Sequence, residues 1–510
     1  MTETPENDKD PLMQFARSRP STPAAALGAA AVLGVATTGC FGGGSAGDQR
    51  LSVELAFPPV MQMSPYSDDA AQLGRLGAAE PLVEVDDEGA PQPLLAESWG
   101  RNGDGTWELI LRDDVTFHDG TAMTADHAAD ALNHATEASP KPRALAGVEL
   151  SAEAVGERTL RVRTDEADPI LPQRLSAPEL AILGPSAYED DPAIPDPTGA
   201  GTGPYELTEV SQTTATLEPH QDYWDGAPQA AGIDVRFVED GASRVGALRA
   251  GEADIVDAVP VTELANITDQ NVLEVPLPRT VGVLLNNDTG AFTDPALRAA
   301  AADAIDSEPI VEEIYEGRAD TVDGIYGPVN DWAHDRPEVE PETEPSDPGG
   351  EPITLATYSD RAELPEAASA VADDLRGSGF EVDVVVQEFA TMETDLLEGS
   401  YDAVIGARSY LLDTNDPVGY LASDWGCDGS YNLAQFCDED IDERISRAAA
   451  ATDVEARIEA AVEIEAEILA THSFVPLAAE RARIGVAEGV EGVAEDPLER
   501  HLVTEETATP

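Results

Sequence analysis

Three cysteines are the residues whose type and spacing most directly suggest chemistry, because thiols form disulfides, bind metals and accept lipids. Cys427 and Cys437 stand ten positions apart with glycine and asparagine between them. This spacing suits a small disulfide loop in an oxidising compartment. The chain-entropy model assigns such a loop about 3 kcal/mol of stabilisation. A zinc site is the alternative, but it lacks a second cysteine pair and a nearby histidine.

Cys40 stands apart from the other two, between an apolar run and a Gly/Ser stretch. The apolar run, residues 24–36, is too short to span a bilayer as a helix and follows two arginines, which is typical of an export signal. The acidic opening, residues 1–10, is unusual for such a signal. We therefore predict a signal peptide over residues 1–39.

The residues just before Cys40 indicate what happens to this cysteine. Thr37-Thr38-Gly39-Cys40 resembles a lipobox, in which the cysteine is acylated after cleavage, although leucine is commonest where Thr37 stands. We expect Cys40 to be the lipid attachment site and residues 40–49 to form a lipidated Gly/Ser tether. Diacylglycerol with N-acylation supplies the two or more chains that stable anchoring needs. A plain cleaved signal is the alternative.

Motifs of enzymes are absent or out of context. Residues 43–47 fit the pattern G-x-S-x-G, but a nucleophile elbow needs a strand before it and a helix after it, and these residues lie in the tether. The seven histidines are scattered, and the chain has no H-E-x-x-H or P-loop motif. We expect no enzymatic activity, no cofactor and no metal site.

The charge of the chain excludes another class of function. The 510 residues include 100 Asp and Glu against 29 Lys and Arg, which gives a formal net charge of −71 at pH 7. Such a chain repels nucleic acid and anionic membrane surfaces, so we expect no nucleic-acid partner and membrane contact only through the lipid. The hydrophobic fraction of 42% is that of a soluble globular protein, and the length predicts two or three structural units.

The elements that must position any site alternate between strands and helices. Residues 102–105 (NGDG) predict a hairpin turn, and residues 331–350, rich in Pro, Glu and Asp, predict a surface linker. The alternation predicts two α/β lobes, with a C-terminal return to the first lobe that makes a hinge. We expect strands at 51–57, 206–218, 233–237, 281–286, 353–358, 381–387, 401–405 and in the last 35 or so residues, and helices at 124–134, 242–250, 294–315 (two), 363–376 and 441–471 (two).

Several segments in a fixed order resemble one family, the family 5 extracellular solute-binding proteins of ABC importers, which bind dipeptides, oligopeptides or nickel. The resemblance covers roughly residues 50 to 490. It is carried by EPLVEVDDEGAPQPLLAESW (80–99), TWELILRDDVTFHDGTAMTADH (106–127), GTGPYELTEV (201–210), DYWDGAP (222–228), RVGALRAGEADI (244–255), FTDPALRAAAADAIDSEPIVEEIYEG (292–317), YDAVIGA (401–407) and NLAQFCDEDIDERI (432–445).

The resemblance implies an α/β, two-lobed, periplasmic-binding-protein-like (Venus flytrap) fold with a hinge and an enlarged first lobe. It also implies an exported, lipid-anchored receptor on the outer face of the cytoplasmic membrane, which we expect to be a monomer. Its partners would be a small solute and the permease subunits of an ABC transporter. The boundaries that we predict are lobe I at 50–285, with an extra subdomain at about 70–200, lobe II at 286–473, and a return to lobe I with a C-terminal tail at 474–510.

The ligand site that the resemblance implies follows the strand at 401–405. In peptide-binding relatives an aspartate there holds the α-ammonium of the peptide, and the matching residue is Asp413. Arg408 and Tyr410 are further candidates to face the cleft. Alternatively, Asp413 and Asp416 merely cap a turn before a proline.

A di- or oligopeptide is the first ligand class that we expect, with nickel or another metal chelate, sugars, opines and other small solutes as alternatives. Nickel-binding relatives carry an aromatic residue where Leu411 aligns. A ligand sensor for a membrane signalling partner and a secreted hydrolase are the competing functions.

Overall fold

The structure is a computed structural model that describes residues 49–86, 89–139, 141–145, 147–165, 167–339, 341, 343–410 and 416–509. The predicted signal peptide, Cys40 and nearly all of the tether lie outside the described residues, and so does Asp413. Within these ranges, no helix has the length and the apolar character needed to cross a membrane.

A ten-stranded sheet forms the centre of the described chain, in the order β14-β13-β15-β12-β16-β11-β1-β10-β9-β8. Two groups of strands in it are parallel: β1 with β10 and β11, and β13 with β14 and β15. Parallel strands need crossover connections, so the chain has the α/β class that its pattern predicts. The strands are β1 Leu51–Leu55, β8 Tyr205–Val210, β9 Thr214–Pro219, β10 Ile233–Phe237, β11 Ile255–Val256, β12 Asn271–Leu285, β13 Pro352–Tyr358, β14 Glu381–Gln387, β15 Ala403–Ser409 and β16 Phe474–Val486.

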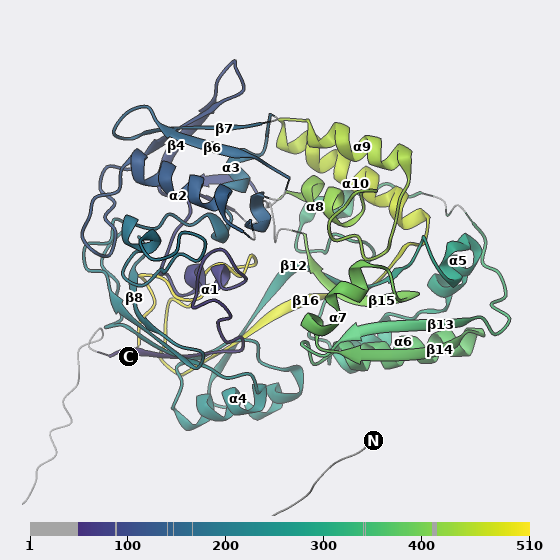
Figure 1. Cartoon of the computed structure of the whole chain (residues 1–510). Coiled ribbons are helices and arrows are strands. Elements are labelled where there is room, and N and C mark those ends of the chain that lie inside the picture. Colours follow the sequence, from purple (N-terminus) through teal and green to yellow (C-terminus); the bar gives the residue numbers. More distant parts are fainter. Residues whose placement is uncertain are drawn as a thin grey trace, which may run out of the picture. The chain divides into compact units, whose positions relative to one another are not determined.

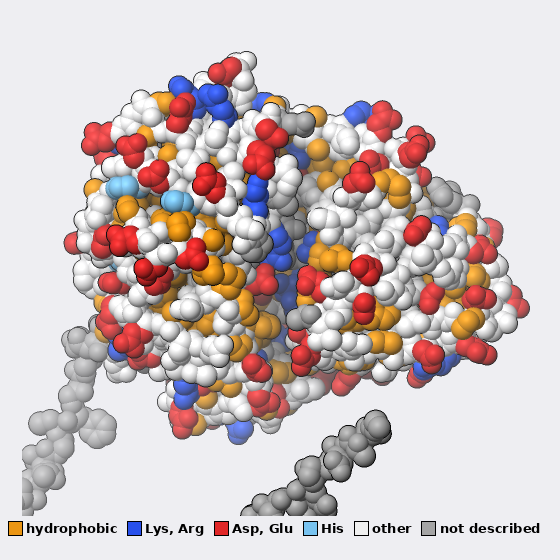
Figure 2. Space-filling model, in the orientation of Figure 1, with side chains coloured by type: hydrophobic (Ala, Val, Ile, Leu, Met, Phe, Trp, Pro, Cys, Tyr) orange, Lys and Arg blue, Asp and Glu red, His pale blue; other side chains and the backbone are white. Residues whose placement is uncertain are grey.

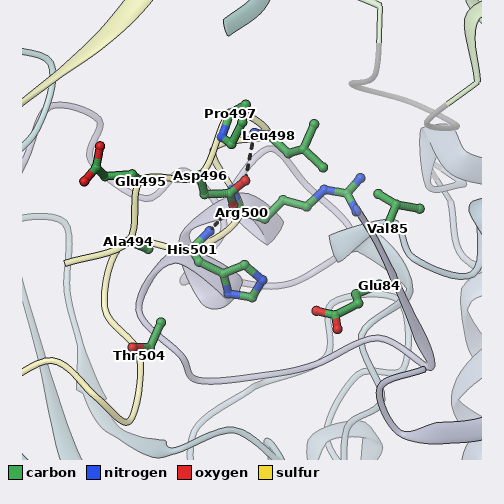
Figure 3. A pocket seen from close by; sticks show the side chains of 10 residues that line it. All are labelled: Glu84, Val85, Ala494, Glu495, Asp496, Pro497, Leu498, Arg500, His501 and Thr504. Atoms are coloured by element: carbon green, nitrogen blue, oxygen red, sulfur yellow. Dashed lines mark hydrogen bonds between the residues drawn. The ribbon is translucent and has the colours of Figure 1, made fainter. Parts of the chain in front are cut away.

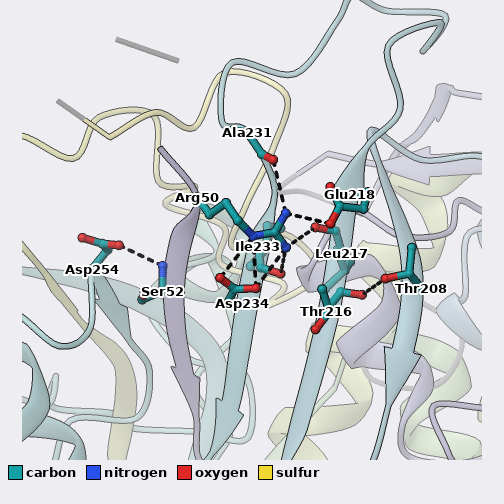
Figure 4. Close-up of polar contacts among 10 residues, drawn as sticks. All are labelled: Arg50, Ser52, Thr208, Thr216, Leu217, Glu218, Ala231, Ile233, Asp234 and Asp254. Atoms are coloured by element: carbon teal, nitrogen blue, oxygen red, sulfur yellow. Dashed lines mark hydrogen bonds and ion pairs between the residues drawn. The ribbon is translucent and has the colours of Figure 1, made fainter. Parts of the chain in front are cut away.

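Arg50 holds the start of β1 to its neighbours in the sheet (Figure 4). Its Nε donates to the carboxylate of Asp234 on β10 at 3.1 Å, and its Nη1 donates to Glu218 on β9 at 2.8 Å. Its Nη2 donates to the carbonyl of Leu217 at 2.9 Å. One guanidinium thus aligns three strands, and because the carboxylates are half exposed each ion pair contributes less than about 1 kcal/mol.

The antiparallel strands β12 and β16 run side by side between two groups of elements (Figure 1). Leu273, near the start of β12, packs against a first hydrophobic core, whereas Val281 and Val283 belong to a second core. β16 changes cores in the same way, from Phe474 in the second core to Ile484 in the first. The two cores therefore define two lobes that share these strands as a hinge.

The change from one core to the other falls inside the hinge strands. The pairing of β12 with β16 shifts register between Pro276 and Thr280, where prolines interrupt the ladder. The predicted lobe boundaries at 285 and 474 lie instead at the end of β12 and the start of β16, because no local pattern in either strand marks the change from one core to the other.

The first lobe carries further sheets outside the main one. A four-stranded sheet has the order β4-β5-β7-β6, and β2 pairs with β3. The predicted turn joins β4 to β5, with Gly105 at a φ of 88°. Thr124 accepts a hydrogen bond from the backbone N–H of His127 and caps the helix that follows. These strands are β2 Val83–Val85, β3 Pro91–Pro93, β4 Ala96–Arg101, β5 Trp107–Leu111, β6 Leu150–Ala154 and β7 Thr159–Thr164.

The helices cover the sheets and end at residues suited to that role. Helix α6, for example, ends at Gly379, whose φ of 113° is one that glycine tolerates. The helices are α1 Ala70–Arg75, α2 Ala125–Glu137, α3 Leu171–Arg174, α4 Gly241–Ala250, α5 Pro295–Ala304, α6 Leu364–Ser378, α7 Phe389–Leu397, α8 Pro417–Asp424, α9 Glu439–Ala449 and α10 Val454–Ala470.

Two regions differ from the sequence-based expectation. Residues 294–315 contain one α-helix, α5, and a short π-helical segment at Ile310–Ile314 rather than two α-helices. The chain after β16 has no further strand among its described residues, apart from an isolated bridge between Glu491 and Ala508. Acidic residues and turns interrupt its alternating pattern, so it winds over the first lobe as irregular chain.

Candidate functional site

The carboxyl ends of the parallel strands mark the place where open α/β sheets bind their ligands. In the first lobe β1 ends at Leu55 and β11 at Val256, and in the second lobe β13 ends at Tyr358 and β15 at Ser409. The segments that follow these four strands are therefore the first candidates for a site.

The loop after β1 is held in a strained form by one buried carboxylate. Asp69 accepts hydrogen bonds from the backbone N–H groups of Val60 (2.9 Å), Met61 (2.7 Å) and Met63 (3.0 Å). Gln62 and Met63 have positive φ values of 54° and 62°, which non-glycine residues rarely adopt. Strained backbone of this kind is common at ligand sites.

The loop after β11 is tied both to the β1 loop and to α1. Asp257 accepts a hydrogen bond from the backbone N–H of Ala56 at 2.8 Å, and it forms an ion pair with Arg75 at 2.8 Å. Its side chain is 3% exposed. A buried carboxylate thus fixes Arg75 at the edge of the first lobe.

Arg408, near the end of β15, is engaged by groups of its own lobe. Its guanidinium donates to both oxygens of Asp424, at 2.7 and 2.8 Å, and lies 4.1 Å from the ring centre of Tyr431. A bidentate pair stacked on an aromatic ring is a rigid arrangement. Arg408 therefore anchors the end of the strand that leads into residues 411–415.

Tyr410 is 4% exposed and lies in an aromatic cluster. Its hydroxyl donates to Oδ1 of Asn330, and its ring centre lies 5.1 Å from that of Tyr326 and 5.7 Å from that of Trp332. The described contacts of Tyr410 are thus with Asn330 and the neighbouring aromatic rings of its own lobe. Asp413, the third candidate on this segment, lies outside the described residues.

Asp416 has a structural role, as its position before a proline predicts. Its carboxylate caps α8 by accepting a hydrogen bond from the backbone N–H of Gly419 at 2.6 Å. It also accepts a hydrogen bond from Nε of Arg457 at 2.8 Å. Arg457 is 2% exposed and also donates to three carbonyls near the end of α9. The pair connects α8, α9 and α10.

Glu480 is the centre of a charged network at the hinge. It lies on β16 opposite the register shift and is 6% exposed. It accepts from Nη1 of Arg361, in the loop after β13, at 3.1 Å and from the hydroxyl of Tyr315 at 3.3 Å. Arg279 of β12 lies 3.8 Å from the same carboxylate. The loop at the carboxyl end of β13 is thereby joined to both hinge strands.

Glu499 reaches the same place from the C-terminal segment. Asp496 accepts from the backbone N–H groups of Leu498, Arg500 and His501 at 2.7 to 2.8 Å, and the resulting turn gives Glu499 a positive φ of 55°. The carboxylate of Glu499 accepts a hydrogen bond from Arg279.

Groups of both lobes act on the Glu499 carboxylate. Burial alone would raise its pKa, but the charges of Arg279, Arg75 and Arg361 hold the pKa below its ordinary value. Arg75 belongs to the edge of the first lobe and Arg361 to that of the second. Cations from the carboxyl edges of both lobes therefore act on Glu499. Figure 2 shows Lys and Arg side chains gathered in the hollow between the two halves of the molecule.

A cavity of about 320 Å³ adjoins this C-terminal segment (Figure 3). Its polar lining includes Glu84, Asp496, Arg500 and His501. Arg500 also donates to the carbonyl of Ser176 at 2.9 Å, which fixes the segment to the first lobe. The cavity is thus a recess of the first lobe next to the segment that carries Glu499.

Cys427 and Cys437 form a disulfide bond. The loop that it closes carries Tyr431, the residue that stacks on Arg408. A second cavity, of about 290 Å³, lies beside this bond and is lined mainly by polar residues such as Asn432 and Gln435. The disulfide therefore supports the wall of the second lobe near the end of β15.

His118 lies in a turn. The backbone N–H of Gly120 donates to the carbonyl of Phe117, and the His118 ring contacts the carbonyl of Gly203 through Nε2 at 3.0 Å. Burial lowers the pKa of His118 to about 4. In the described ranges, no three His, Cys, Asp or Glu side chains are grouped so that they could hold a metal ion.

The model of the bacterial extracellular solute-binding proteins, family 5, matches residues 90–432. This match covers more than half of the chain and spans both lobes and the hinge strand β12. The chain belongs to this family. Its members are extracellular or periplasmic solute-binding proteins.

Relatives and solved structures agree with this assignment. The nickel-binding protein NikA of Staphylococcus aureus is 25% identical over 441 residues, which cover 82% of this chain and 86% of that protein. The structure of S. aureus NikA in complex with Ni(L-His)2 has a TM-score of 0.75 at 22% identity, and covers 91% of this chain and 100% of its own. DppA of Helicobacter pylori in complex with the peptide STSA has a TM-score of 0.73 at 19% identity, covering 89% and 97%. The fold is that of two-lobed periplasmic binding proteins.

The residues of the charged network at the hinge cannot be predicted from local motifs. Arg75, Arg279, Arg361, Glu480 and Glu499 come from five separate segments, and no local motif marks any of them. One signal was available. The chain has only 29 Lys and Arg, so several arginines close together in the fold indicate a site that requires positive charge.

Proposed function

We propose that this chain captures a small solute, foremost a di- or oligopeptide, by closing its two lobes and delivers the solute to the permease of an ABC importer. The observation that carries the proposal is the charged network at the hinge, in which Arg279 lies between Glu480, the partner of Arg361, and Glu499. Arg75 of the first lobe and Arg361 of the second both lower the pKa of Glu499. Groups of both lobes surround this place, so closing them would bury a ligand and exclude water from its polar contacts.

The mixed charges of the site favour a zwitterionic ligand such as a peptide. Arginines can pair with a carboxylate, and a carboxylate of the protein can pair with an ammonium group. We assign the second role to Asp413, on the segment that follows β15. Arg408 and Tyr410 support this segment through Asp424 and Asn330. Peptide binding also fits relatives of the family such as DppA, solved with a bound peptide.

A metal chelate is the second candidate. The nickel-binding protein NikA of Staphylococcus aureus is 25% identical to this chain, and the alignment covers 82% of the chain. A nickel chelate would present carboxylates of its organic ligand to the same arginines. It could therefore bind between the lobes without an ammonium group. The two classes are separated by experiment.

A thermal-shift screen of the purified chain tests the proposal. Di- and oligopeptides, nickel with histidine, nickel alone, and sugars form its arms. A ligand at 100 times its Kd stabilises the native state by about 2.7 kcal/mol, which raises Tm measurably. We expect peptides to give the shift. A shift with nickel and histidine alone would replace peptides by chelates, and no shift in any arm would contradict solute capture from these classes.

Asp413→Asn tests the ammonium contact. A charge-assisted hydrogen bond contributes about 1.5 to 3 kcal/mol, so peptide affinity measured by calorimetry should fall tenfold or more. Asp373→Asn is the matched control, because Asp373 lies on the exposed face of α6 and pairs only with Arg376 at 3.0 Å among the described residues. Unchanged affinity in the Asp413 variant would remove this residue from the site.

The lipid anchor is part of the proposal. Acylated Cys40 would tether the receptor beside its permease on the outer face of the membrane, with the receptor acting as a monomer. Cys40→Ser should release the protein into the medium, as cell fractionation and immunoblotting would show. Retention of this variant on the membrane would refute the anchor and leave the solute site unaffected.

A further inference from the structure

Glu499 differs from the other carboxylates of the hinge in its backbone and its exposure. Its φ of 55° is one that side-chain-bearing residues rarely adopt, and the turn built by Asp496 imposes it. Its side chain is 35% exposed, whereas that of Glu480 is 7% exposed. Glu499 therefore reaches its arginine partner from a forced position and at the accessible side of the network.

The charges around Glu499 balance only when its carboxylate is present. Arg75 pairs with Asp257 at 2.8 Å and Arg361 pairs with Glu480 at 3.1 Å, so two of the three arginines have a carboxylate of their own. Arg279 lies 3.8 Å from Glu480, which it shares, and its other acidic partner is Glu499. Without Glu499 the set carries one positive charge in excess, and an anion would restore neutrality.

The arginines also keep donors that the described groups do not use. Arg361 is 33% exposed, and the one hydrogen bond that its guanidinium makes to a described group is the one to Glu480. Nε of Arg75 is buried and has no partner in the described part of the chain. A guanidinium has five N–H donors, so these arginines can bind a ligand carboxylate in place of Glu499 while Asp257 and Glu480 stay bound.

We propose that Glu499 is a built-in counter-ion that a carboxylate of the ligand replaces when the lobes close, so that the receptor selects solutes with an acidic group. The ligand carboxylate takes the place of Glu499 beside Arg279 and Arg361, and Glu499 turns to solvent on its exposed side. This inference rests on the proposed solute capture and specifies one end of the ligand.

The probes are matched peptides that differ only in one charge. Ala-Ala, Ala-Leu, Leu-Leu and Ala-Ala-Ala are each titrated into the full mature chain as the free acid and as the C-terminal amide, by calorimetry and thermal shift. In the native protein the free acids should bind about tenfold or more tightly than the amides, because a charged hydrogen bond is lost on amidation.

Variants of Glu499 separate replacement from a structural role. Glu499→Gln and Glu499→Gly both remove the competing carboxylate, and glycine also accepts the positive φ, so one of the two should fold well. In both, the free acids should bind several-fold more tightly while the amides change little, so the ratio of the two dissociation constants rises. Arg361→Gln should lower that ratio. Glu363→Gln, which breaks the separate pair with Arg483 at 2.8 Å, should leave it unchanged.

Each outcome decides a different statement. Equal affinity for acids and amides in the native protein would overturn the inference and leave peptide capture standing. An unchanged ratio in both Glu499 variants, with only Tm altered, would make Glu499 a structural residue and would also overturn it. Failure of every peptide, acid or amide, to bind any of the proteins would overturn the proposed function together with this inference.

Discussion

Two carboxylates of the molecule, Glu80 in the first lobe and Glu499 at the hinge, meet opposite surroundings. Glu80 is 7% exposed and accepts hydrogen bonds from the hydroxyl of Tyr223 at 2.8 Å and from the indole of Trp224 at 3.1 Å. These donors are neutral, and burial raises the pKa of Glu80 to about 7. The pKa of Glu499 is instead held low by three arginines.

This difference shows where the protein places its few cations. Near Glu80 the guanidinium of Arg112 lies over the Trp224 ring at 3.9 Å and donates to the carbonyl of Leu94, not to the carboxylate. At the hinge the arginines point at carboxylates. In a chain with a net charge of −71, a group of ionised acids at neutral pH needs such cations, and the hinge is one place where the chain supplies them.

Removing a hinge arginine should have the largest effect. Arg279→Met leaves Glu480 and Glu499 with fewer cations in a site where the arginine is only 12% exposed. Breaking a buried ion pair by removing one partner costs about 3 kcal/mol or more. Urea unfolding at pH 7 should show a loss of this size.

Arg318→Met is the matched control for that loss. Arg318 also pairs with a carboxylate of the hinge, Glu274, but it is 48% exposed. Exposed ion pairs contribute less than about 1 kcal/mol. Equal losses in the two arginine variants would mean that the network at Glu480 has no special weight.

The sequence predicts elements well where one strand or helix carries its own pattern. Strands β10 and β14 have the predicted limits, and the two helices predicted over 441–471 are present as α9 and α10, with a break at residues 450–453. The first half of β12 was not predicted, because Pro276 and Pro278 interrupt its alternation. That half is a strand because β16 pairs with it, and pairing between residues about 200 positions apart leaves no local signal.

The candidate site divides in the same way. Asp413 could be named because it lies in a segment that resembles peptide-binding relatives. Arg361 and Glu499 could not, because each is one residue of an ordinary polar loop until the fold brings the two loops together. The small number of Lys and Arg residues draws attention to every arginine, but it does not predict which arginines lie close together in the fold.

Glu80→Gln should change the pH dependence of stability by an intermediate amount. The pKa of Glu80 rises from an ordinary value of 4.5 to about 7 on folding, so between these values the native state holds a proton that the unfolded state has lost. Native stability therefore falls as pH rises through this range, by about 1.4 kcal/mol per pH unit. The variant lacks this term.

Urea unfolding of both proteins at pH 5, 6, 7 and 8 measures the term contributed by Glu80. The stability of the variant relative to the native protein should rise from pH 5 to pH 7 and then level off. A difference that stays constant with pH would show that Glu80 titrates normally and that neutral donors suffice to keep it ionised.

Glu499→Gln should give the smallest effect, and one of opposite sign with pH. Because the pKa of Glu499 is lowered on folding, its contribution is present above the ordinary value of 4.5 and is lost as pH falls through the folded pKa. The side chain is about one-third exposed, so solvent screening keeps the contribution below about 1 kcal/mol. Unfolding from pH 7 down to pH 3 should show the native protein slightly more stable than the variant at the start and equal to it at the end. If the variant instead gains stability relative to the native protein as pH rises, as expected for Glu80→Gln, then burial outweighs the arginines at the hinge, and the contrast between the two carboxylates fails.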